Sequence, residues 1–180
     1  MGIGKLLIAN RGEIAVRIIR AAQELGIRTV QVHSAADADS LAVKMADEAV
    51  LIGPPAAAKS YLKIDAILDA ARATGADAVH PGYGFLAENA DFADAVVAAG
   101  LIWVGPSGQV IRTMGDKVAA RTTAQAAGVP VVPGSDGRVD DPEAARAIAQ
   151  SIGFPVMIKA AAGGGGRGIR IAQTVEEFER

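Results

Sequence analysis

Apolar runs of strand length alternate with helical repeats along the N-terminal part of the chain. The runs of strand length lie at 5–9, 29–32, 49–52, 76–80 and 101–104. Between them, apolar residues recur at the spacing of a buried helix face over 14–22, 41–46, 64–71 and 89–99. Strands that are apolar throughout and alternate with helices are typical of parallel sheets covered on both faces. The sequence therefore predicts an α/β domain over 1–107, a Rossmann-like parallel sheet with helices on both faces.

A different pattern follows this domain. Apolar residues at helical spacing predict a helical connector within 108–132, and Pro130 begins an extended stretch at its end. Asp141-Pro142-Glu143 has the composition of a helix start, with Asp as the N-cap and Pro in the first turn.

Two further strand runs lie at 155–160 and 169–172, and the capping-box spacing from Thr174 begins another helix. That helix has barely started at Arg180. We therefore expect 133–180 to be an incomplete lid subdomain, cut where the chain ends.

Four successive glycines, Gly163–Gly166, separate these two strand runs and are flanked by Lys159 and Arg167. Glycine amides are free of side-chain obstruction and approach a polyphosphate closely. The spacing G-x-G-x-x-G, ending at Gly168, would suit a dinucleotide loop, but a strand follows where that loop needs a helix. A phosphate loop would need Lys-Ser/Thr after its last glycine. A plain hairpin and a lid over phosphates remain, and the basic flanks favour the lid.

The segment from Lys159 to Arg170 resembles the glycine-rich loop of biotin carboxylases, members of the ATP-grasp superfamily. Other stretches match the same family in its order and spacing: Ile8 to Ala15, His80 to Leu86, Met114 to Lys117, and Pro133 to Ser135. The resemblance covers essentially the whole chain. It implies a pre-ATP-grasp domain, the helical connector and the start of an ATP-grasp lid domain.

The resemblance also implies roles for individual residues. Those expected to bind ATP are Lys117, Lys159, Gly164, Gly165, Gly166, Arg167 and Ile169. The lysines would hold phosphates and the purine edge, the glycine amides would cover the phosphates, and Ile169 would contact adenine. If the family resemblance is set aside, Lys117 is interpreted as a solvated helix residue and Lys159 as the lysine at the end of a strand.

Tyr83 and Gly84 follow the fourth strand, where open parallel sheets collect ligands. We expect them near biotin or bicarbonate, although a Pro-Gly turn with a packed tyrosine is an equal alternative. His80 is interpreted as a structural histidine. Arg11 and Glu13, after the first strand, are expected to brace the interface with the rest of the enzyme.

Arg17, Arg20 and Glu24 lie on one face of the first helix, at spacings i, i+3 and i+7. A solvated face is the simple interpretation. The resemblance offers a homodimer contact instead.

The family uses ATP and Mg²⁺ to activate bicarbonate as carboxyphosphate and then carboxylates biotin on a carrier protein. The resemblance thus implies a ligase with two partners, a biotin carboxyl carrier domain and a carboxyltransferase subunit or domain. An acyl-CoA carboxylase alpha subunit of fatty acid metabolism is favoured, but the sequence does not choose among acetyl-CoA, propionyl-CoA, methylcrotonyl-CoA, pyruvate and urea as acceptor. The metal ligands and catalytic residues are expected beyond this chain, which should be inactive alone.

Two alternatives come from other classes: another ATP-grasp ligase, such as a relative of carbamoyl phosphate synthase, and a non-catalytic assembly module. The His80–Leu86 and Ala9–Ala15 stretches argue against the first.

Net charge and composition indicate which classes of partner to expect. The net charge is −2, which gives no electrostatic reason to expect nucleic acid or an anionic membrane. No apolar run reaches the length of a membrane span, and no targeting segment precedes the first strand. The chain has no cysteine, which excludes disulfides and thiolate metal sites and fits a cytoplasmic protein.

Overall fold

The computed structural model describes residues 2–135, 137–159 and 168–179. The chain forms two compact units, Met1–Gly115 and Asp116–Arg180, and each is considered by itself.

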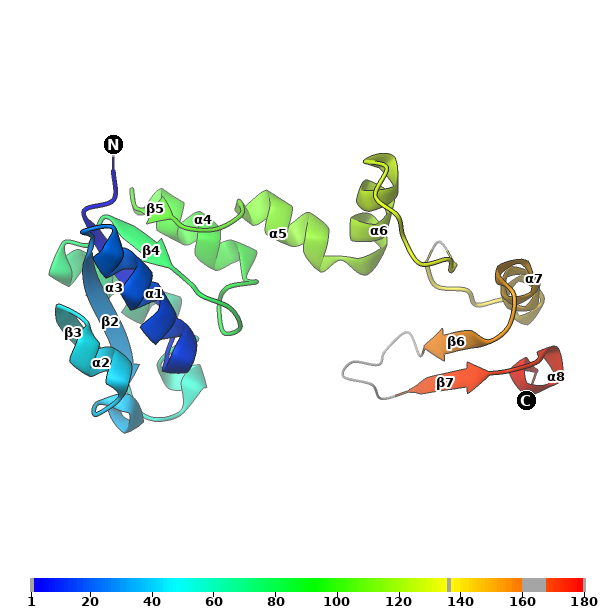
Figure 1. The fold of residues 1–180 in the computed structure, drawn as a ribbon, viewed down its shortest axis with the longest axis horizontal. Coiled ribbons are helices and arrows are strands. Elements are labelled where there is room, and N and C mark those ends of the chain that lie inside the picture. The colour runs from blue at the N-terminus through cyan, green and yellow to red at the C-terminus, as the bar shows by residue number, and fades with distance from the viewer. Residues whose placement is uncertain (1, 136, 160–167, 180) are drawn as a thin grey trace. The chain divides into compact units, whose positions relative to one another are not determined.

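The first unit is built on a five-stranded sheet in which all neighbours are parallel, in the order β3-β2-β1-β4-β5 (Figure 1). The strands are β1 (Lys5–Ile8), β2 (Arg28–Ser34), β3 (Glu48–Gly53), β4 (Ala78–His80) and β5 (Ile102–Trp103). At the centre of the sheet, Leu7 lies opposite Val30 on one side and Val79 on the other. The predicted parallel sheet is confirmed.

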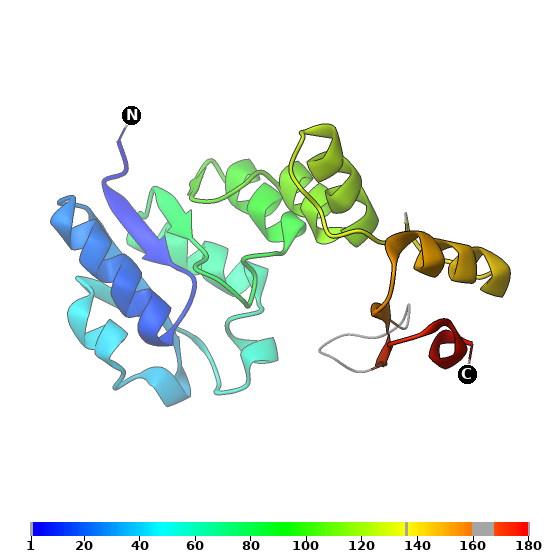
Figure 2. The ribbon, with the colours of Figure 1, turned by 45° about the vertical axis from the view of Figure 1, so that its right-hand side comes forward.

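Helices cover both faces of this sheet (Figure 2). They are α1 (Gly12–Glu24), α2 (Leu41–Met45), α3 (Ile64–Thr74) and α4 (Ala90–Ala98). The unit also contains the short 3₁₀ helices η1 (Ala35–Asp37) and η2 (Ala57–Lys59), and α5 (Gly108–Gly115), which packs against α4. Leu6 and Ile8 pack against α1 and α2, whereas Leu7 packs against α3 and α4. Successive residues of a strand point to opposite faces, so one apolar strand serves two separate cores.

Local signals set the helix boundaries. The side chain of Asn89 accepts a hydrogen bond from the Phe92 amide at 2.9 Å and caps α4. Gly75 ends α3 in the left-handed conformation, with φ of 64°.

Polar contacts join β2 to Asp47, the residue just before β3. Thr29 is fully buried, and its amide and hydroxyl both donate to the Asp47 carboxylate at 2.8 Å. These two hydrogen bonds lower the pKa of Asp47 because they stabilise its charged form.

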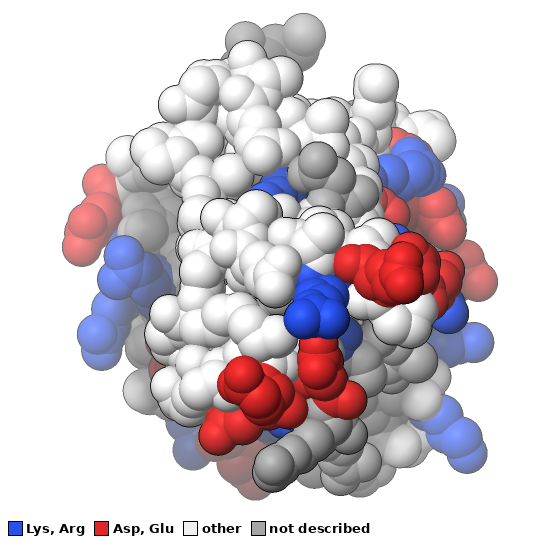
Figure 3. Space-filling model, turned by 90° about the vertical axis from the view of Figure 1, so that its right-hand side faces the viewer, with Lys and Arg blue, Asp and Glu red and all other residues white. Residues whose placement is uncertain are grey.

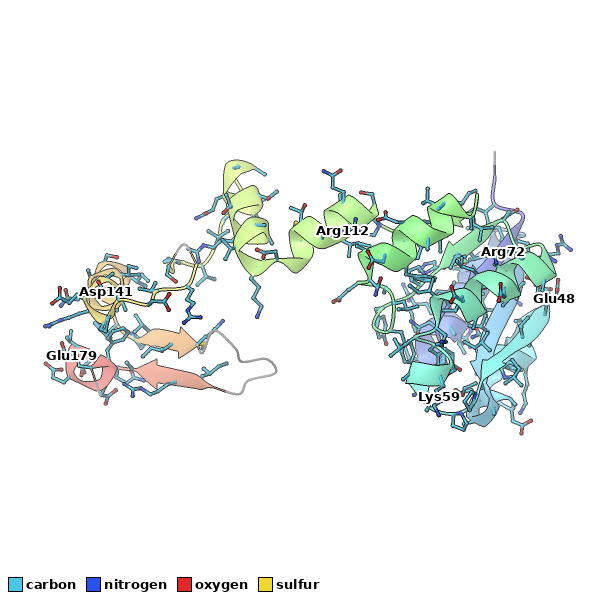
Figure 4. All side chains as sticks on the ribbon, turned by 180° about the vertical axis from the view of Figure 1, so that it is seen from behind. Glu48, Lys59, Arg72, Arg112, Asp141 and Glu179 are labelled. Atoms are coloured by element: carbon cyan, nitrogen blue, oxygen red, sulfur yellow. The ribbon has the colours of Figure 1, made fainter. Side chains whose placement is uncertain are left out.

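The second unit contains α6 (Lys117–Ala126), α7 (Pro142–Ile152), β6 (Val156–Lys159), β7 (Ile169–Ala172) and α8 (Val175–Phe178). β6 and β7 pair antiparallel, and Val156 and Ala172 form a small core with Ala149 of α7. Asp141, labelled in Figure 4, caps α7 by accepting from the amides of Glu143 and Ala144.

The stretch predicted as one helical connector is two helices. Asp116 has an extended backbone between α5 and α6, and its side chain accepts from the Ala119 amide at 2.8 Å. An aspartate in this conformation begins a new helix instead of continuing the previous one. The boundary between the two units lies at this residue.

Acidic and basic side chains lie next to one another on the face shown in Figure 3, and neither sign forms a continuous patch there. In the described part of the chain, every helix is too short or too polar to cross a membrane.

We predict that Phe92→Ala lowers the free energy of unfolding of the first unit by about 3–5 kcal/mol, the usual cost of emptying a buried aromatic site. Phe92 is fully buried, and its ring meets Trp103 edge-on with 5.3 Å between ring centroids. Because Trp103 is the one tryptophan of the sequence, its fluorescence follows urea unfolding of this unit. Leu25→Ala, at a side chain that is 75% exposed, is the control and should change little.

Candidate functional site

The segments that follow β1 and β4 meet at Asn10, which is only 3% exposed. The Asn10 side-chain amide donates to the carbonyl oxygens of Pro81 at 2.7 Å and Tyr83 at 2.8 Å. Its side-chain oxygen accepts from the Arg11 amide at 2.9 Å. Parallel strands end at the same edge of a sheet, which brings these two loops together.

A Pro-Gly turn shapes the loop after β4. The Gly82 amide donates to His80 Nδ1 at 3.0 Å, and burial lowers the pKa of His80, which keeps this ring neutral and able to accept. Gly82 has φ of 66°, and a Cβ atom there would lie 2.8 Å from Asn10 Nδ2. Both the backbone conformation and the close approach therefore require glycine. His80 thus has the contacts of a structural histidine.

An open depression of about 420 Å³ lies beside this turn. It is lined by residues 10–14 of the first loop and helix, and by Tyr83, Gly84 and Phe85. The Tyr83 side chain is 62% exposed, and its hydroxyl donates to the Glu13 carboxylate. That hydrogen bond and the negative charge of Glu13 raise the pKa of Tyr83. Tyr83 and Gly84 are thus brought together on a polar rim.

Arg11 and Phe85 form the other part of the rim. The Arg11 guanidinium lies 6.0 Å from the centre of the Phe85 ring and 3.4 Å from the Asp37 carboxylate. The Phe85 ring stacks on Tyr61, with centroids 5.0 Å apart.

The polar end of this cluster is buried. The Tyr61 hydroxyl donates to Asp37 at 2.7 Å and accepts from the Ser34 amide at 3.0 Å. Burial and the hydrogen bond to Asp37 raise the pKa of Tyr61 to about 12. Burial alone would raise the pKa of Asp37, but hydrogen bonds from Ser34 and Tyr61 outweigh it and lower that pKa.

Sequence analysis missed Asp37 and Tyr61, because nothing in their local sequence indicates a contact with Arg11 or Phe85. It placed Arg11 and Glu13 at an interface with the rest of the enzyme. In the structure, the two side chains contact Asp37, Phe85 and Tyr83 of their own unit.

Among the residues expected to bind ATP, the structure brings Lys159 and Ile169 together. They lie directly opposite each other on β6 and β7, and Met157 and Ile171 form the next pair on the same face. Met157, Ile169 and Ile171 are 55%, 44% and 55% exposed.

Of the other residues expected to bind ATP, only Lys117 lies in the described part of the chain. Lys117 is the exposed first residue of α6. Gly164, Gly165, Gly166 and Arg167 lie outside the described residues. Tyr83 and Gly84 belong to the first unit and the ATP residues to the second.

The face of α1 that carries Arg17, Arg20 and Glu24 is exposed, whereas Ala15, Ile18, Ile19 and Ala22 fill the core. These charged side chains are therefore available to a partner.

A parallel α/β unit with a polar depression at its strand ends, followed by an antiparallel hairpin around a glycine-rich stretch, is the arrangement of an ATP-grasp protein. Comparison with known families defines the group further. Residues 2–111 match the family described as "Biotin carboxylase, N-terminal domain", and residues 116–180 match "Carbamoyl-phosphate synthase L chain, ATP binding domain". The chain belongs to the biotin carboxylase family, which confirms the resemblance found in the sequence.

Individual relatives agree with this assignment. The chain is 59% identical to a biotin carboxylase of Halalkalibacterium halodurans over 98% of its own length and 39% of the relative's. It is 56% identical to the mitochondrial propionyl-CoA carboxylase alpha chain of Sus scrofa, over 96% of its own length and 24% of the relative's.

Solved structures are also similar. A Campylobacter jejuni biotin carboxylase described as a beta-gamma-ATP complex superposes with a TM-score of 0.86 at 47% identity, over 99% of this chain and 40% of that one. The biotin carboxylase domain dimer of Hydrogenobacter thermophilus 2-oxoglutarate carboxylase, in complex with MgADP, ADP and bicarbonate, gives 0.83 at 50% identity, over 99% of this chain and 39% of that one. This chain therefore spans about two fifths of the length of each of these two structures.

We predict that Glu13→Gln lowers the pKa of Tyr83 toward its ordinary value, because the substitution removes the negative charge that favours the neutral phenol. The chain has two tyrosines, and Tyr61 should still titrate at about 12, so an absorbance titration of the phenols separates them. Glu88→Gln, at an exposed residue nearby in the chain, is the matched control. An unchanged Tyr83 titration in Glu13→Gln would contradict the Glu13–Tyr83 contact.

Proposed function

We propose that the protein containing this chain is the biotin carboxylase component of a biotin-dependent carboxylase. It would use ATP and bicarbonate to carboxylate biotin on a carrier protein. The observation that carries this proposal is the match to biotin carboxylases over 98% of the chain, which includes both the depression and the nucleotide hairpin.

The hairpin residues fit a nucleotide. Met157, Ile169 and Ile171 present an exposed apolar face suited to the plane of adenine, and Lys159 adds a positive charge to that face. Lys117 and the segment Gly164–Arg167 are the further candidates for ATP. Bicarbonate is a poor electrophile, so one of its oxygens must be phosphorylated, and that transfer depends on positioning and charge neutralisation. Lysines and glycine amides supply both.

Mg²⁺ would neutralise charge on the transferred phosphate when bound. Within residues 2–135, 137–159 and 168–179, no group of three or more histidine, aspartate or glutamate side chains is placed to hold a metal ion. We name no Mg²⁺ ligand among these residues and derive no step from the metal.

The depression in the first unit fits biotin or bicarbonate. Tyr83 offers an exposed phenol beside Gly84, whose backbone carries no side chain to block an approaching ring. The Glu13 carboxylate accepts a hydrogen bond from the Tyr83 hydroxyl, and its negative charge favours the neutral form of this phenol. We assign biotin or bicarbonate to this rim.

The wider assignment concerns the carboxylase in which this component works. Relatives named biotin carboxylase and propionyl-CoA carboxylase alpha chain are 59% and 56% identical to this chain, too similar to separate the acyl acceptors. We propose an acyl-CoA carboxylase alpha subunit, active in cytoplasmic fatty acid metabolism, that works with a biotin carboxyl carrier domain and a carboxyltransferase. The match of residues 2–111 to the biotin carboxylase N-terminal domain favours this over a carbamoyl phosphate synthase relative.

We predict that the complete polypeptide carrying this chain releases ADP in the presence of bicarbonate, and that free biotin increases the rate. Lys159→Gln should raise the KM for ATP by about tenfold or more, because it removes a charge-assisted hydrogen bond to the nucleotide. Lys59→Gln, an exposed lysine of the first unit labelled in Figure 4, is the control and should leave this KM unchanged.

If biotin does not change the rate of ADP release by the complete polypeptide, the proposed reaction is overturned. Equal KM values for ATP in wild type and Lys159→Gln would overturn only the role of Lys159.

We also propose that Arg17, Arg20 and Glu24 form part of a homodimer contact, supported by their exposure on one face of α1. Arg20→Glu should weaken self-association by about tenfold through like-charge repulsion. Sedimentation at graded concentrations measures this. Lys63→Glu reverses an exposed charge before α3 and should have no effect, and equal dissociation by both variants would argue against the α1 face.

A further inference from the structure

We propose that Asn10 is the positioning residue of the Tyr83–Gly84 loop, and that it sets the affinity for biotin by holding Tyr83 in place. The inference rests on the proposed function, which assigns biotin or bicarbonate to the rim that carries Tyr83, and it takes biotin as the occupant. Asn10 belongs to the first loop of the sheet, and the loop it holds begins 71 positions later along the chain.

The Asn10 side chain is committed to backbone groups. Its amide nitrogen donates to Pro81 O and Tyr83 O at 2.7 and 2.8 Å, and its oxygen accepts from the Arg11 amide. With 3% of its surface exposed, it has little contact with solvent. A buried amide whose donors and acceptor are all used in this way has one stable orientation.

Asn10 is itself rigidly held. Its carbonyl oxygen accepts from Gln31 Nε2 at 2.6 Å, and the amide of the preceding residue, Ala9, donates to His80 O at 2.9 Å. These contacts extend the pairing of β1 with its neighbours β2 and β4. Asn10 therefore transmits the position of the central strand to the loop.

The other contacts of this loop hold other atoms, among them the Tyr83 hydroxyl, which donates to Glu13. His80 holds the amide of Gly82, and Tyr61 holds the ring of Phe85. Among the hydrogen bonds of the described residues, the bond from Asn10 is the one that fixes the Tyr83 carbonyl. Loss of that bond frees the peptide between Tyr83 and Gly84, while both ends of the loop stay anchored.

Gly82 provides an independent route to the same displacement. A Cβ atom at Gly82 would lie 2.8 Å from Asn10 Nδ2 and 3.2 Å from Ile14 Cγ1. A side chain at this position pushes the loop away from Asn10, with Asn10 itself intact. Gly82→Ala and a substitution of Asn10 should therefore give the same functional change.

Asn10→Asp is the sharpest variant. It keeps the shape of the side chain and the oxygen that accepts from Arg11, but it replaces the donor with an oxygen that faces two carbonyl oxygens. We expect the KM for free biotin to rise by about tenfold or more, from the loss of both hydrogen bonds and the repulsion between oxygens. The KM for ATP, whose proposed residues lie in the second unit, should stay at its wild-type value.

The experiment uses the complete polypeptide and measures ADP release against biotin and against ATP for wild type, Asn10→Asp, Gly82→Ala and Thr29→Val. Thr29→Val removes the part-buried side-chain hydrogen bond from Thr29 to Asp47, which lies outside the depression. It should lower the melting temperature and leave the KM for biotin unchanged.

The outcomes separate the two proposals. Wild type without biotin-dependent ADP release overturns the proposed function. If wild type responds to biotin, two results overturn the role of Asn10: an unchanged KM for biotin in both Asn10→Asp and Gly82→Ala, or equal increases in the KM values for biotin and ATP. The expected result is a rise in the KM for biotin alone, shared by both variants and absent from Thr29→Val.

Discussion

β1 pairs with β2 on one side and with β4 on the other, and all four of its residues are buried. The candidate site depends on this double pairing. Because the strands are parallel, β1 and β4 end side by side, and residues about 70 positions apart in the chain meet at Asn10 and Pro81. The depression at the sheet edge, with Tyr83 and Glu13 on its rim, follows from that register.

The polar side chains of Asn10 and Asp37 are well satisfied at these strand ends. Asn10 uses its whole side-chain amide on backbone groups, and Asp37 collects hydrogen bonds from Ser34 and Tyr61. Buried polar groups are costly unless paired, so these contacts have one geometry. The exposed Tyr83 side chain is attached to this rigidly held backbone. A rigid backbone suits the ligand contact that we propose for Tyr83.

The second unit has a different balance. In the part of this unit that the structure describes, the buried core residues are Ala149, Val156 and Ala172, and one face of the β6–β7 hairpin is exposed. Such a small core contributes little hydrophobic stabilisation. The proposed nucleotide site uses this exposed face, which Met157, Ile169 and Ile171 form.

The sequence by itself determined the parallel α/β fold, because apolar strands and amphipathic helices carry their periodicity in consecutive residues. It also located the cap at Asp141, the loop that holds Tyr83 and the strand that carries Lys159, since turn and capping preferences are local. Only the tertiary structure decided that Asn10 holds Tyr83, that Asp37 and Tyr61 support Arg11 and Phe85, and that the connector breaks at Asp116. The first two depend on strand order and register, which bring distant residues within hydrogen-bonding range and leave no mark in the local pattern. At Asp116, helical spacing on both sides concealed a cap that is recognised only from the backbone conformation.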